Sequence, residues 1–148
     1  KIPQQKKLNC YRWLNTVKII TMTNTTLTNP SILFADDDED LLELAKLKLS
    51  KSGFRVRISH NAHNIANMIS EERPDLILLD VSMQGIDGRD ICQALKNHKA
   101  TSDIPVIIIS GNNDIKNTAL MCGADDYIEK PFHTETVKQK IQSMLVQK

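Results

Sequence analysis

The stretch that decides the fold reads Pro74-Asp75-Leu76-Ile77-Leu78-Leu79-Asp80-Val81-Ser82-Met83-Gln84-Gly85-Ile86-Asp87-Gly88. Its apolar run from Leu76 to Leu79 has no polar alternation, which is typical of a strand buried on both faces of a parallel sheet. A carboxylate, Asp80, ends the run, and a loop with two glycines follows. Open α/β sheets place their ligands at the carboxyl ends of the strands, so the pattern predicts that Asp80 lies in a binding site.

Short apolar runs alternate with helical patterns along the rest of the chain. The alternation of apolar and basic side chains at 54–58 indicates an edge strand. Five strands that alternate with five helices predict a doubly wound α/β fold with a five-stranded parallel sheet and helices on both faces. The predicted strands are residues 32–35, 54–58, 76–79, 106–109 and 127–128. The apolar positions that mark the five helices are Leu41, Ala45 and Leu49; Ala62, Ile65 and Ile69; Ile91, Ala94 and Leu95; Ile115, Ala119 and Leu120; and Val137, Ile141 and Met144. Thr134 is the predicted N-cap of the last helix.

Length and composition are those of one soluble globular domain. The chain has 148 residues, of which 25% are charged, and its formal net charge is +1. Residues 1–30 hold five basic side chains and no acidic one, which leaves 14 basic and 18 acidic side chains for residues 31–148. Because this larger part is mildly acidic, we expect it not to bind nucleic acid directly.

The cysteines and the hydropathy pattern predict a cytoplasmic protein that does not enter a membrane. Cys10, Cys92 and Cys122 are odd in number and lack C-x-x-C spacing, which favours free thiols in a reducing compartment. The sequence has no apolar run of the ~18 residues that a membrane span needs. A signal peptide over residues 14–22 is disfavoured because Asn15 and Lys18 interrupt the apolar run.

The first 30 residues differ from the rest, and we expect them to form a basic, poorly ordered tail that ends in a Thr/Asn-rich linker. Trp13, Val17 and Ile20 have the spacing of one short amphipathic helix. The chain begins with Lys, and Met22 stands directly before the linker, so we hypothesise that Met22 is the natural start. The mass of the N-terminal peptide of the native protein tests this. Residues 31–148 form the predicted folded domain.

Side chains that can carry chemistry follow four of the predicted strands. Asp36 and Asp37 follow the first strand, Asp80 the third, Ser110 the fourth and Lys130 the fifth. Since the carboxyl ends of parallel strands share one edge of the sheet, we expect these residues to meet in one crevice. Three carboxylates at close range repel one another unless a cation neutralises them, and Mg²⁺ with its oxygen ligands suits such a site.

This set of residues predicts phosphoryl transfer to Asp80. An ionised aspartate held by a metal and a lysine can attack an activated phosphorus and form an acyl phosphate. Lys130 and Ser110 would contact phosphoryl oxygens, because the reaction needs mainly positioning and charge neutralisation. Taken singly, Asp36 and Asp37 could equally cap a helix, Ser110 could do the same, and Lys130 could be a solvated side chain. Asp80 is the hardest to explain by packing alone.

Five segments closely resemble the receiver domain of two-component response regulators. The resemblance covers about residues 31–146, in order and without large gaps, and implies a flavodoxin-like sheet with the strand order 2-1-3-4-5. It also implies a cis peptide bond before Pro131, which would aim Lys130. The five segments are 32–40, 74–80, 85–88, 105–110 and 123–132.

The resemblance assigns roles to single residues and implies Mg²⁺ as the cofactor. Asp37 would be a direct metal ligand, whereas Asp36 would act on the metal mainly through water. On phosphorylation, Ser110 would move toward the phosphoryl group and Tyr127 would swing inward, which biases a pre-existing equilibrium. The implied roles are phosphoacceptor for Asp80; metal binding for Asp36, Asp37, Asp80 and the backbone carbonyl of Ser82; phosphoryl binding for Ser110 and Lys130; and switching for Ser110 and Tyr127.

The resemblance also implies partners. A histidine kinase or a phosphotransfer protein would donate the phosphoryl group. The fourth helix, the last strand and the last helix would form the readout face, through which the chain could also form a homodimer. Since no output domain follows in this sequence, we expect either a stand-alone receiver or the receiver part of a hybrid histidine kinase.

Three residues depart from the usual pattern of the family. Gln84 stands where a proline is common, so we expect the loop after Asp80 to be less rigid. Ser110 replaces the commoner threonine but keeps the hydroxyl. Gly111 stands where a small residue, often alanine, is usual, which should ease the movement of Tyr127.

Three other functions compete with this interpretation. A haloacid-dehalogenase-type phosphatase would need a second aspartate two positions after the nucleophile, where this chain has Ser82. A flavodoxin-like nucleotide binder would need a phosphate loop after the first strand, where Asp36 and Asp37 would repel a phosphate. A degenerate receiver that acts only as an interaction module is disfavoured because the reactive residues are present. We expect a signalling domain that is not an enzyme and catalyses only its own phosphorylation and dephosphorylation.

Overall fold

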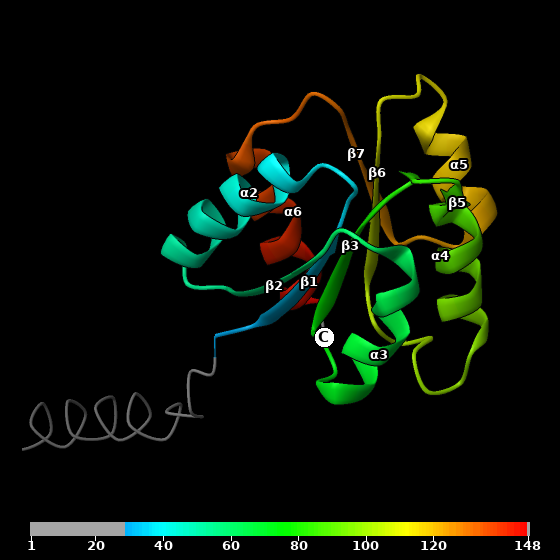
Figure 1. Cartoon of the computed structure of the whole chain (residues 1–148), viewed down its shortest axis with the longest axis horizontal. Helices are drawn as coiled ribbons and strands as arrows, with labels where there is room; N and C mark the ends of the chain where they lie inside the picture. The colour runs from blue at the N-terminus through cyan, green and yellow to red at the C-terminus, as the bar shows by residue number, and fades with distance from the viewer. Residues whose placement is uncertain (1–28, 148) are drawn as a thin grey trace, which may run out of the picture.

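A five-stranded parallel sheet forms the centre of the protein, for which the computed structural model describes residues 29–147 (Figure 1). The sheet order is β2-β1-β3-β6-β7, which confirms the order 2-1-3-4-5 and the edge position of β2. The helix predicted around Trp13, the hypothesised start at Met22 and most of the linker lie outside the described residues. The strands are β1 (Ser31–Ala35), β2 (Arg55–Ser59), β3 (Leu76–Asp80), β6 (Val106–Ser110) and β7 (Asp126–Glu129).

The two central strands are apolar at nearly every position because helices cover both faces of the sheet. All five residues of β1 and all five of β3 are buried. The pairing is parallel, with Ala35 opposite Leu79 and Asp80 opposite Ile109. The carboxyl ends of these strands therefore lie at one level, and the residues that follow them share one edge of the sheet.

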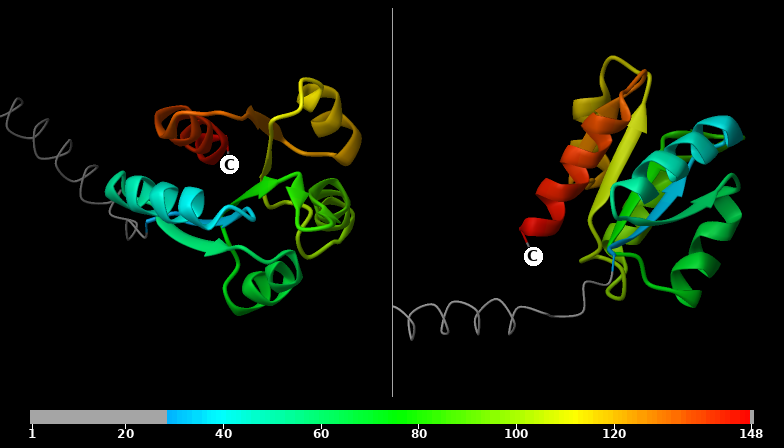
Figure 2. Two further views of the ribbon diagram at one scale, coloured as in Figure 1. Left: turned by 45° about the horizontal axis from the view of Figure 1, so that its top comes forward. Right: turned by 90° about the vertical axis from the view of Figure 1, so that its left-hand side faces the viewer.

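Within residues 29–147, two helices cover one face of the sheet and three cover the other (Figure 2). Leu42, Leu49 and Ile141 pack with Phe34 in the core beneath the first pair. Cys92 and Ile115 pack with Leu33 and Ile108 in the core beneath the other three. The helices are α2 (Glu39–Lys51) and α6 (Thr134–Val146) on the first face, and α3 (Ile65–Glu71), α4 (Gly88–Asn97) and α5 (Ile115–Cys122) on the second.

Three local predictions were wrong. Thr134 is the first helical residue of α6, and His133 holds the N-cap position without a side-chain hydrogen bond. Leu120 is 72% exposed, because Ala119 and Cys122 turn the buried side of α5 to the sheet and Leu120 faces solvent. The helix predicted to include Ala62 begins as a separate 3-10 turn, η1 (Ala62–Asn64), before α3.

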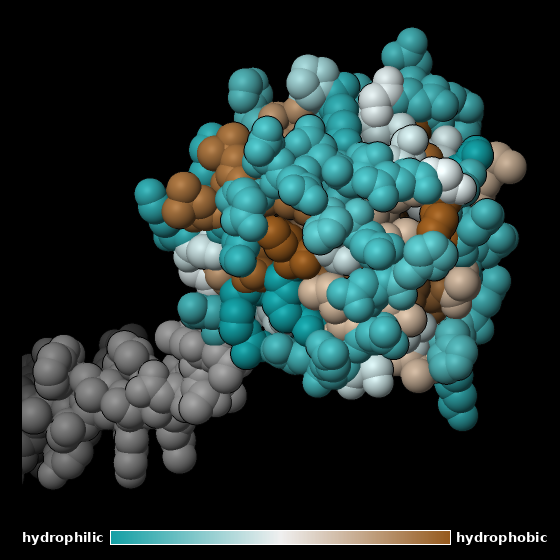
Figure 3. All heavy atoms as spheres, viewed as in Figure 1, coloured by the Kyte–Doolittle hydropathy of each residue, from teal (hydrophilic) through white to brown (hydrophobic). Residues whose placement is uncertain are grey.

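Most of the surface seen in Figure 3 is hydrophilic, with hydrophobic side chains gathered over α2. The exposed large apolar residues of α2 are Leu44 and Leu47, which are 52% and 55% exposed. Among residues 29–147, no helix combines the length and the hydropathy that crossing a membrane requires.

Candidate functional site

Three carboxylates meet at the carboxyl ends of β1 and β3. One oxygen atom from each of Asp36, Asp37 and Asp80 lies within 4.8 Å of the others. Asp36 is fully buried and Asp80 is 3% exposed, whereas Asp37 is open to solvent. The structure thus brings together the three carboxylates that the strand ends predicted.

Lys130 reaches this cluster from the end of β7. Its Nζ lies 2.7 Å from Oδ2 of Asp36 and 3.1 Å from Oδ1 of Asp80. Its backbone N–H donates to the carbonyl oxygen of Ser110 at 2.9 Å, which extends the pairing of β6 with β7 by one bond. The peptide bond between Lys130 and Pro131 is cis, as predicted.

One ammonium group serves two buried carboxylates, and the pKa values of Asp80 and Lys130 reflect this. Burial raises the pKa of Asp80, the charge of Asp36 raises it further, and the hydrogen bond from Lys130 opposes the rise without cancelling it. Burial favours the neutral amine of Lys130, but its hydrogen bonds to Asp36 and Asp80 outweigh burial and raise its pKa. A lysine that is shared cannot fully stabilise either carboxylate, so the site keeps an excess of negative charge.

The two oxygens of Asp36 are already engaged. Oδ1 accepts the backbone N–H of Asp38 at 3.0 Å, and Oδ2 accepts the ammonium of Lys130. Asp38 is in turn the N-cap of α2, since its side chain accepts the N–H of Leu41. Asp36 is therefore tied to the start of α2, while Asp37 and Asp80 keep more of their acceptor capacity for another ligand.

This donor set fits a hard divalent cation. Carboxylate oxygens are the protein ligands that Mg²⁺ prefers, and it binds through one or two of them together with waters and phosphate oxygens. The excess negative charge of the cluster attracts such a cation. Asp37 and Asp80 would be its direct carboxylate ligands.

A short hairpin that sequence patterns did not predict follows Asp80. Strands β4 (Ser82–Met83) and β5 (Ile86–Asp87) pair antiparallel, with Ser82 opposite Asp87. The two residues between them, Gln84 and Gly85, both have positive φ, at 40° and 81°, as in a type I′ turn. Ser82, the predicted carbonyl ligand, thus lies on a defined hairpin, and the lower rigidity expected of this loop stays a prediction.

Gln84 holds a backbone conformation that a proline cannot adopt, because the ring of proline fixes φ near −65°. We expect Gln84→Pro to lower the free energy of unfolding by ~1 kcal/mol or more. Gln84→Asn should raise it slightly, because asparagine followed by glycine is the pair that type I′ turns favour. Urea unfolding of the three proteins measures both effects. A proline variant as stable as the wild type would contradict this turn.

Gly88, the first residue of α4, packs directly on the backbone at the end of β3, the strand that carries Asp80. Its N–H donates to the carbonyl of Val81 at 2.7 Å. A Cβ atom at this position would lie 2.1 Å from the carbonyl oxygen of Asp80 and 2.9 Å from Cα of Val81. The glycine is therefore required by close approach, and in the sequence it was marked only by its place in segment 85–88 of the family resemblance.

Ser110 and Tyr127 lie on the same face of the sheet. Ser110 is two residues beyond Ile108 on β6, and Tyr127 of β7 is the register partner of Ile108. Side chains two apart on a strand share a face, so Tyr127 is a diagonal neighbour of Ser110. The hydroxyl oxygen of Ser110 accepts the N–H of Asn112 at 3.1 Å, within its own loop, and Tyr127 is half-buried.

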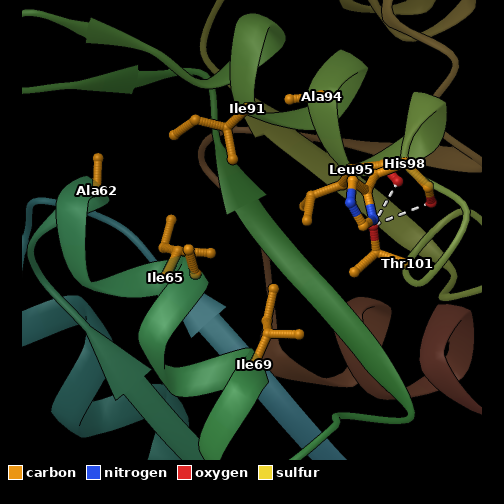
Figure 4. A pocket seen from close by; sticks show the side chains of 9 residues that line it. Ala62, Ile65, Ile69, Ile91, Ala94, Leu95, His98 and Thr101 are labelled. Carbon is orange, nitrogen blue, oxygen red and sulfur yellow. Dashed lines mark hydrogen bonds between the residues drawn. The ribbon is translucent and has the colours of Figure 1, made fainter.

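One hollow in the surface adjoins the charged site, and another lies between two helices. One of about 680 Å³ adjoins the site: it is bounded by α2, including the exposed Leu44, and by the segment from Lys130 to Thr134. The other, of about 420 Å³, lies between α3 and α4, where Ile65, Ile69 and Ile91 face one another (Figure 4). The second hollow is lined by no carboxylate, so it is not part of the charged site.

A family model of the response regulator receiver domain matches residues 32–142. The chain belongs to this family. It is thus a signalling domain of two-component systems, whose response regulators interact with histidine kinases.

Receiver-containing proteins of known sequence and structure support the match. The transcriptional regulatory protein AfsQ1 of Streptomyces coelicolor is 33% identical over 118 residues, which cover 78% of this chain and 51% of that protein. The response regulator MprA of Mycobacterium tuberculosis is 32% identical over 116 residues, covering 77% of this chain and 50% of that protein. This chain therefore spans about half the length of these curated relatives.

Two solved receiver domains share the fold. The signal receiver domain of a signal transduction histidine kinase from Syntrophus aciditrophicus matches with a TM-score of 0.73 and 31% identity, over 79% of this chain and 90% of that one. The receiver domain of NtrX from Brucella abortus matches with a TM-score of 0.72 and 31% identity, over 79% of this chain and 99% of that one. Receivers thus occur in a histidine kinase and in longer regulatory proteins, and the choice between a stand-alone receiver and part of a hybrid kinase stays untested.

Proposed function

We propose that Asp80 accepts a phosphoryl group from a histidine kinase or a phosphotransfer protein in a Mg²⁺-dependent reaction. The observation that carries this proposal is the placement of a nearly buried carboxylate within hydrogen-bonding distance of Lys130 and beside two further carboxylates. Asp36, Asp37 and the carbonyl of Ser82 would complete the metal site. Asp80 would react as the ionised carboxylate, since only that form is nucleophilic.

The residues of the site have separate tasks in this reaction. A carboxylate oxygen of Asp80 attacks phosphorus, the new O–P bond forms, and the bond from phosphorus to the donor nitrogen breaks. Lys130, already 3.1 Å from Asp80, meets the negative charge of the transferred oxygens, and the Ser110 hydroxyl donates to one of them. Bound Mg²⁺ would neutralise charge on the phosphoryl oxygens and on the carboxylates.

Phosphorylation with a small acyl-phosphate donor tests the proposal without a cognate kinase. The full chain is incubated with the donor and Mg²⁺, and the mass gain of one phosphoryl group is followed. We expect an acid-stable, base-labile adduct that forms with Mg²⁺ and fails to form in chelator. Equal labelling in chelator would overturn the metal dependence, and no labelling under any condition would favour a receiver that acts only as an interaction module.

Mg²⁺ should also stabilise the folded protein, because the metal binds the native cluster and not the unfolded chain. At a free concentration of ten times Kd, linkage predicts a gain of about 1.4 kcal/mol in the free energy of unfolding. Asp37→Asn should lose most of this gain, and it should fold normally because Asp37 is exposed. Thermal melts with and without Mg²⁺ measure the effect. An unchanged Mg²⁺ response in Asp37→Asn would remove Asp37 from the metal site.

The donor protein would dock beside the site, over the hollow bounded by α2 and residues 130–134. Leu44 and Leu47 expose apolar surface on α2, and Lys48 and Lys130 add positive charge nearby. This position would present a donor histidine to Asp80. Contiguous exposed apolar surface marks interaction sites, and Leu44 and Leu47 are three residues apart on the same helix.

The readout would use the opposite flank of the site. Phosphorylation would draw Ser110 toward the phosphoryl group and let Tyr127 turn inward, so that the face formed by α5, β7 and α6 changes. Leu120 of α5 is exposed on this side of the molecule and would serve a partner or a second copy of the chain. AfsQ1 is described as a transcriptional regulatory protein, so the absence of direct contact with nucleic acid stays a prediction.

A further inference from the structure

Lys140 of α6 reaches across the edge of the sheet to β7. Its Nζ donates to both carboxylate oxygens of Asp126, at 2.9 and 2.8 Å. The same Nζ lies 5.4 Å from the centre of the Tyr127 ring. A cation this close to an aromatic ring is attracted by the ring's negative face. Because Asp126 already fixes the ammonium group, the contact with the ring requires little further ordering of the lysine.

We propose that Lys140 is a positioning residue that holds the Tyr127 ring in the position it has here, beside Lys140, and so sets how far the receiver is switched before phosphorylation. The inference rests on the proposed function, in which Tyr127 turns inward when Asp80 is phosphorylated. Lys140 lies outside the charged cluster, and none of the roles assigned above depends on it.

The sheet explains why the contact exists in only one of the two states. Tyr127 packs against the core beneath α4 and α5, whereas α6 lies on the other face of the sheet, over Ile128. Lys140 therefore meets the ring around the outer edge of β7. An inward turn carries the ring along the sheet toward Ser110, and Lys140 cannot follow because Asp126 and the body of α6 retain it.

Because the contact is made in one of the two states and not in the other, it shifts the equilibrium between them by its full interaction free energy. The side chains of Lys140 and Asp126 are 32% and 21% exposed, so the ring contact lies in the weaker range of such interactions. Its loss should raise the population of the inward state about two- to fivefold. Because an activating ligand binds the inward state, its apparent affinity should rise by the same factor.

The test compares Lys140→Met with two matched variants. Methionine keeps the apolar stem of the side chain and removes the charge. Lys140→Arg keeps a cation that can both pair with Asp126 and stack on the ring. Lys138→Met removes a charge from the same helix, where the ammonium pairs with Glu135 instead. A purely structural role of Lys140 would lower the melting temperature without tightening any ligand.

The measurement is a titration of the full chain with beryllofluoride, a tetrahedral mimic of a phosphoryl group, in the presence of Mg²⁺. The chain has two tyrosines, Tyr11 and Tyr127, so fluorotyrosine labelling gives two fluorine signals, and Tyr127→Phe assigns them. We expect the Tyr127 signal of the wild type to move on saturation. Lys140→Met should bind beryllofluoride about two- to fivefold more tightly, while Lys140→Arg and Lys138→Met should match the wild type.

The outcomes separate this inference from the proposed function. If the wild-type signal moves and Lys140→Met shows unchanged or weaker affinity, the switch stands and the role of Lys140 is overturned. If Lys138→Met tightens binding as much as Lys140→Met, charge alone is responsible and the contact with the ring is again overturned. If beryllofluoride binds without moving the Tyr127 signal of the wild type, the switch itself fails, and the role of Lys140 fails with it.

Discussion

Asp80→Asn should abolish phosphoryl acceptance and, in metal-free buffer at neutral pH, raise the free energy of unfolding. The amide is not a nucleophile, so no acyl phosphate can form. The same change removes a buried negative charge that stands beside Asp36 and shares Lys130 with it. Phosphoprotein mass and urea unfolding in chelator measure the two effects. Asp90→Asn, which changes an exposed carboxylate in the first turn of α4, should leave phosphoryl acceptance intact and should not raise the free energy of unfolding.

The pH dependence of this gain follows from the raised pKa of Asp80. Folding makes the ionised carboxylate less favourable, because burial and Asp36 oppose the charge. Above the folded-state pKa of Asp80, the charged carboxylate lowers the free energy of unfolding by its full amount. This destabilisation disappears as the pH falls below 3.8, the ordinary pKa of the carboxyl group. Wild type and Asp80→Asn should therefore differ most at neutral pH and converge in acid. A variant that is less stable than the wild type at neutral pH, or that still accepts the phosphoryl group, would contradict the assignment.

Gly88→Ala should destabilise the protein and impair phosphorylation together. The added Cβ would lie 2.1 Å from the carbonyl oxygen of Asp80 and 2.9 Å from Cα of Val81. Because both of these neighbours are backbone atoms, either β3 or α4 must shift. Forcing extra volume into a packed interior costs about 1–3 kcal/mol, occasionally more. The displaced segment carries Asp80 itself, so the initial rate of labelling should fall as well. Urea unfolding and labelling rates are the measurements.

Gly111→Ala is the matched control for this substitution. Its added Cβ would meet nothing closer than the Lys130 Cβ at 4.0 Å, and Gly111 is not among the glycines with positive φ. The alanine should therefore raise the free energy of unfolding by about 0.4–1 kcal/mol, because it restricts the unfolded chain. If both glycine variants had the same stability, the close packing of Gly88 on Asp80 would be wrong.

The sequence predicted the sheet and the meeting of its charged residues because both follow from burial. An uninterrupted apolar run as short as Leu76 to Leu79 is typical of a strand covered on both faces. Once the strands are parallel, the residues that follow them share an edge, whatever their separation along the chain. For this reason Asp36, Asp80 and Lys130 could be grouped before any distance was known.

The features that escaped prediction depend on contacts or are too short for a pattern. The strands of the hairpin around Gln84 have two residues each, which is below the length at which alternation can be recognised. Position 88 requires glycine because the backbone of Asp80 and Val81, in another segment, approaches it closely. Leu120 matched the apolar spacing of a helix, but only the docking of α5 shows that this side chain faces solvent. Lys130 likewise offsets only part of the negative charge of Asp80, because it also contacts Asp36, and this sharing is visible only in the folded structure.

The bond between Lys130 and Asp36 joins residues that are 94 positions apart in the chain. A nascent or truncated chain that lacks β7 would have to bury Asp36 and Asp80 without a counter-charge, which is strongly unfavourable. The reactive site can therefore assemble only when the last strand is in place. Loop closure over such a separation is also slow. We therefore expect the last strand to complete the site late in folding, and a partly synthesised receiver to lack the arrangement that the proposed phosphorylation of Asp80 requires.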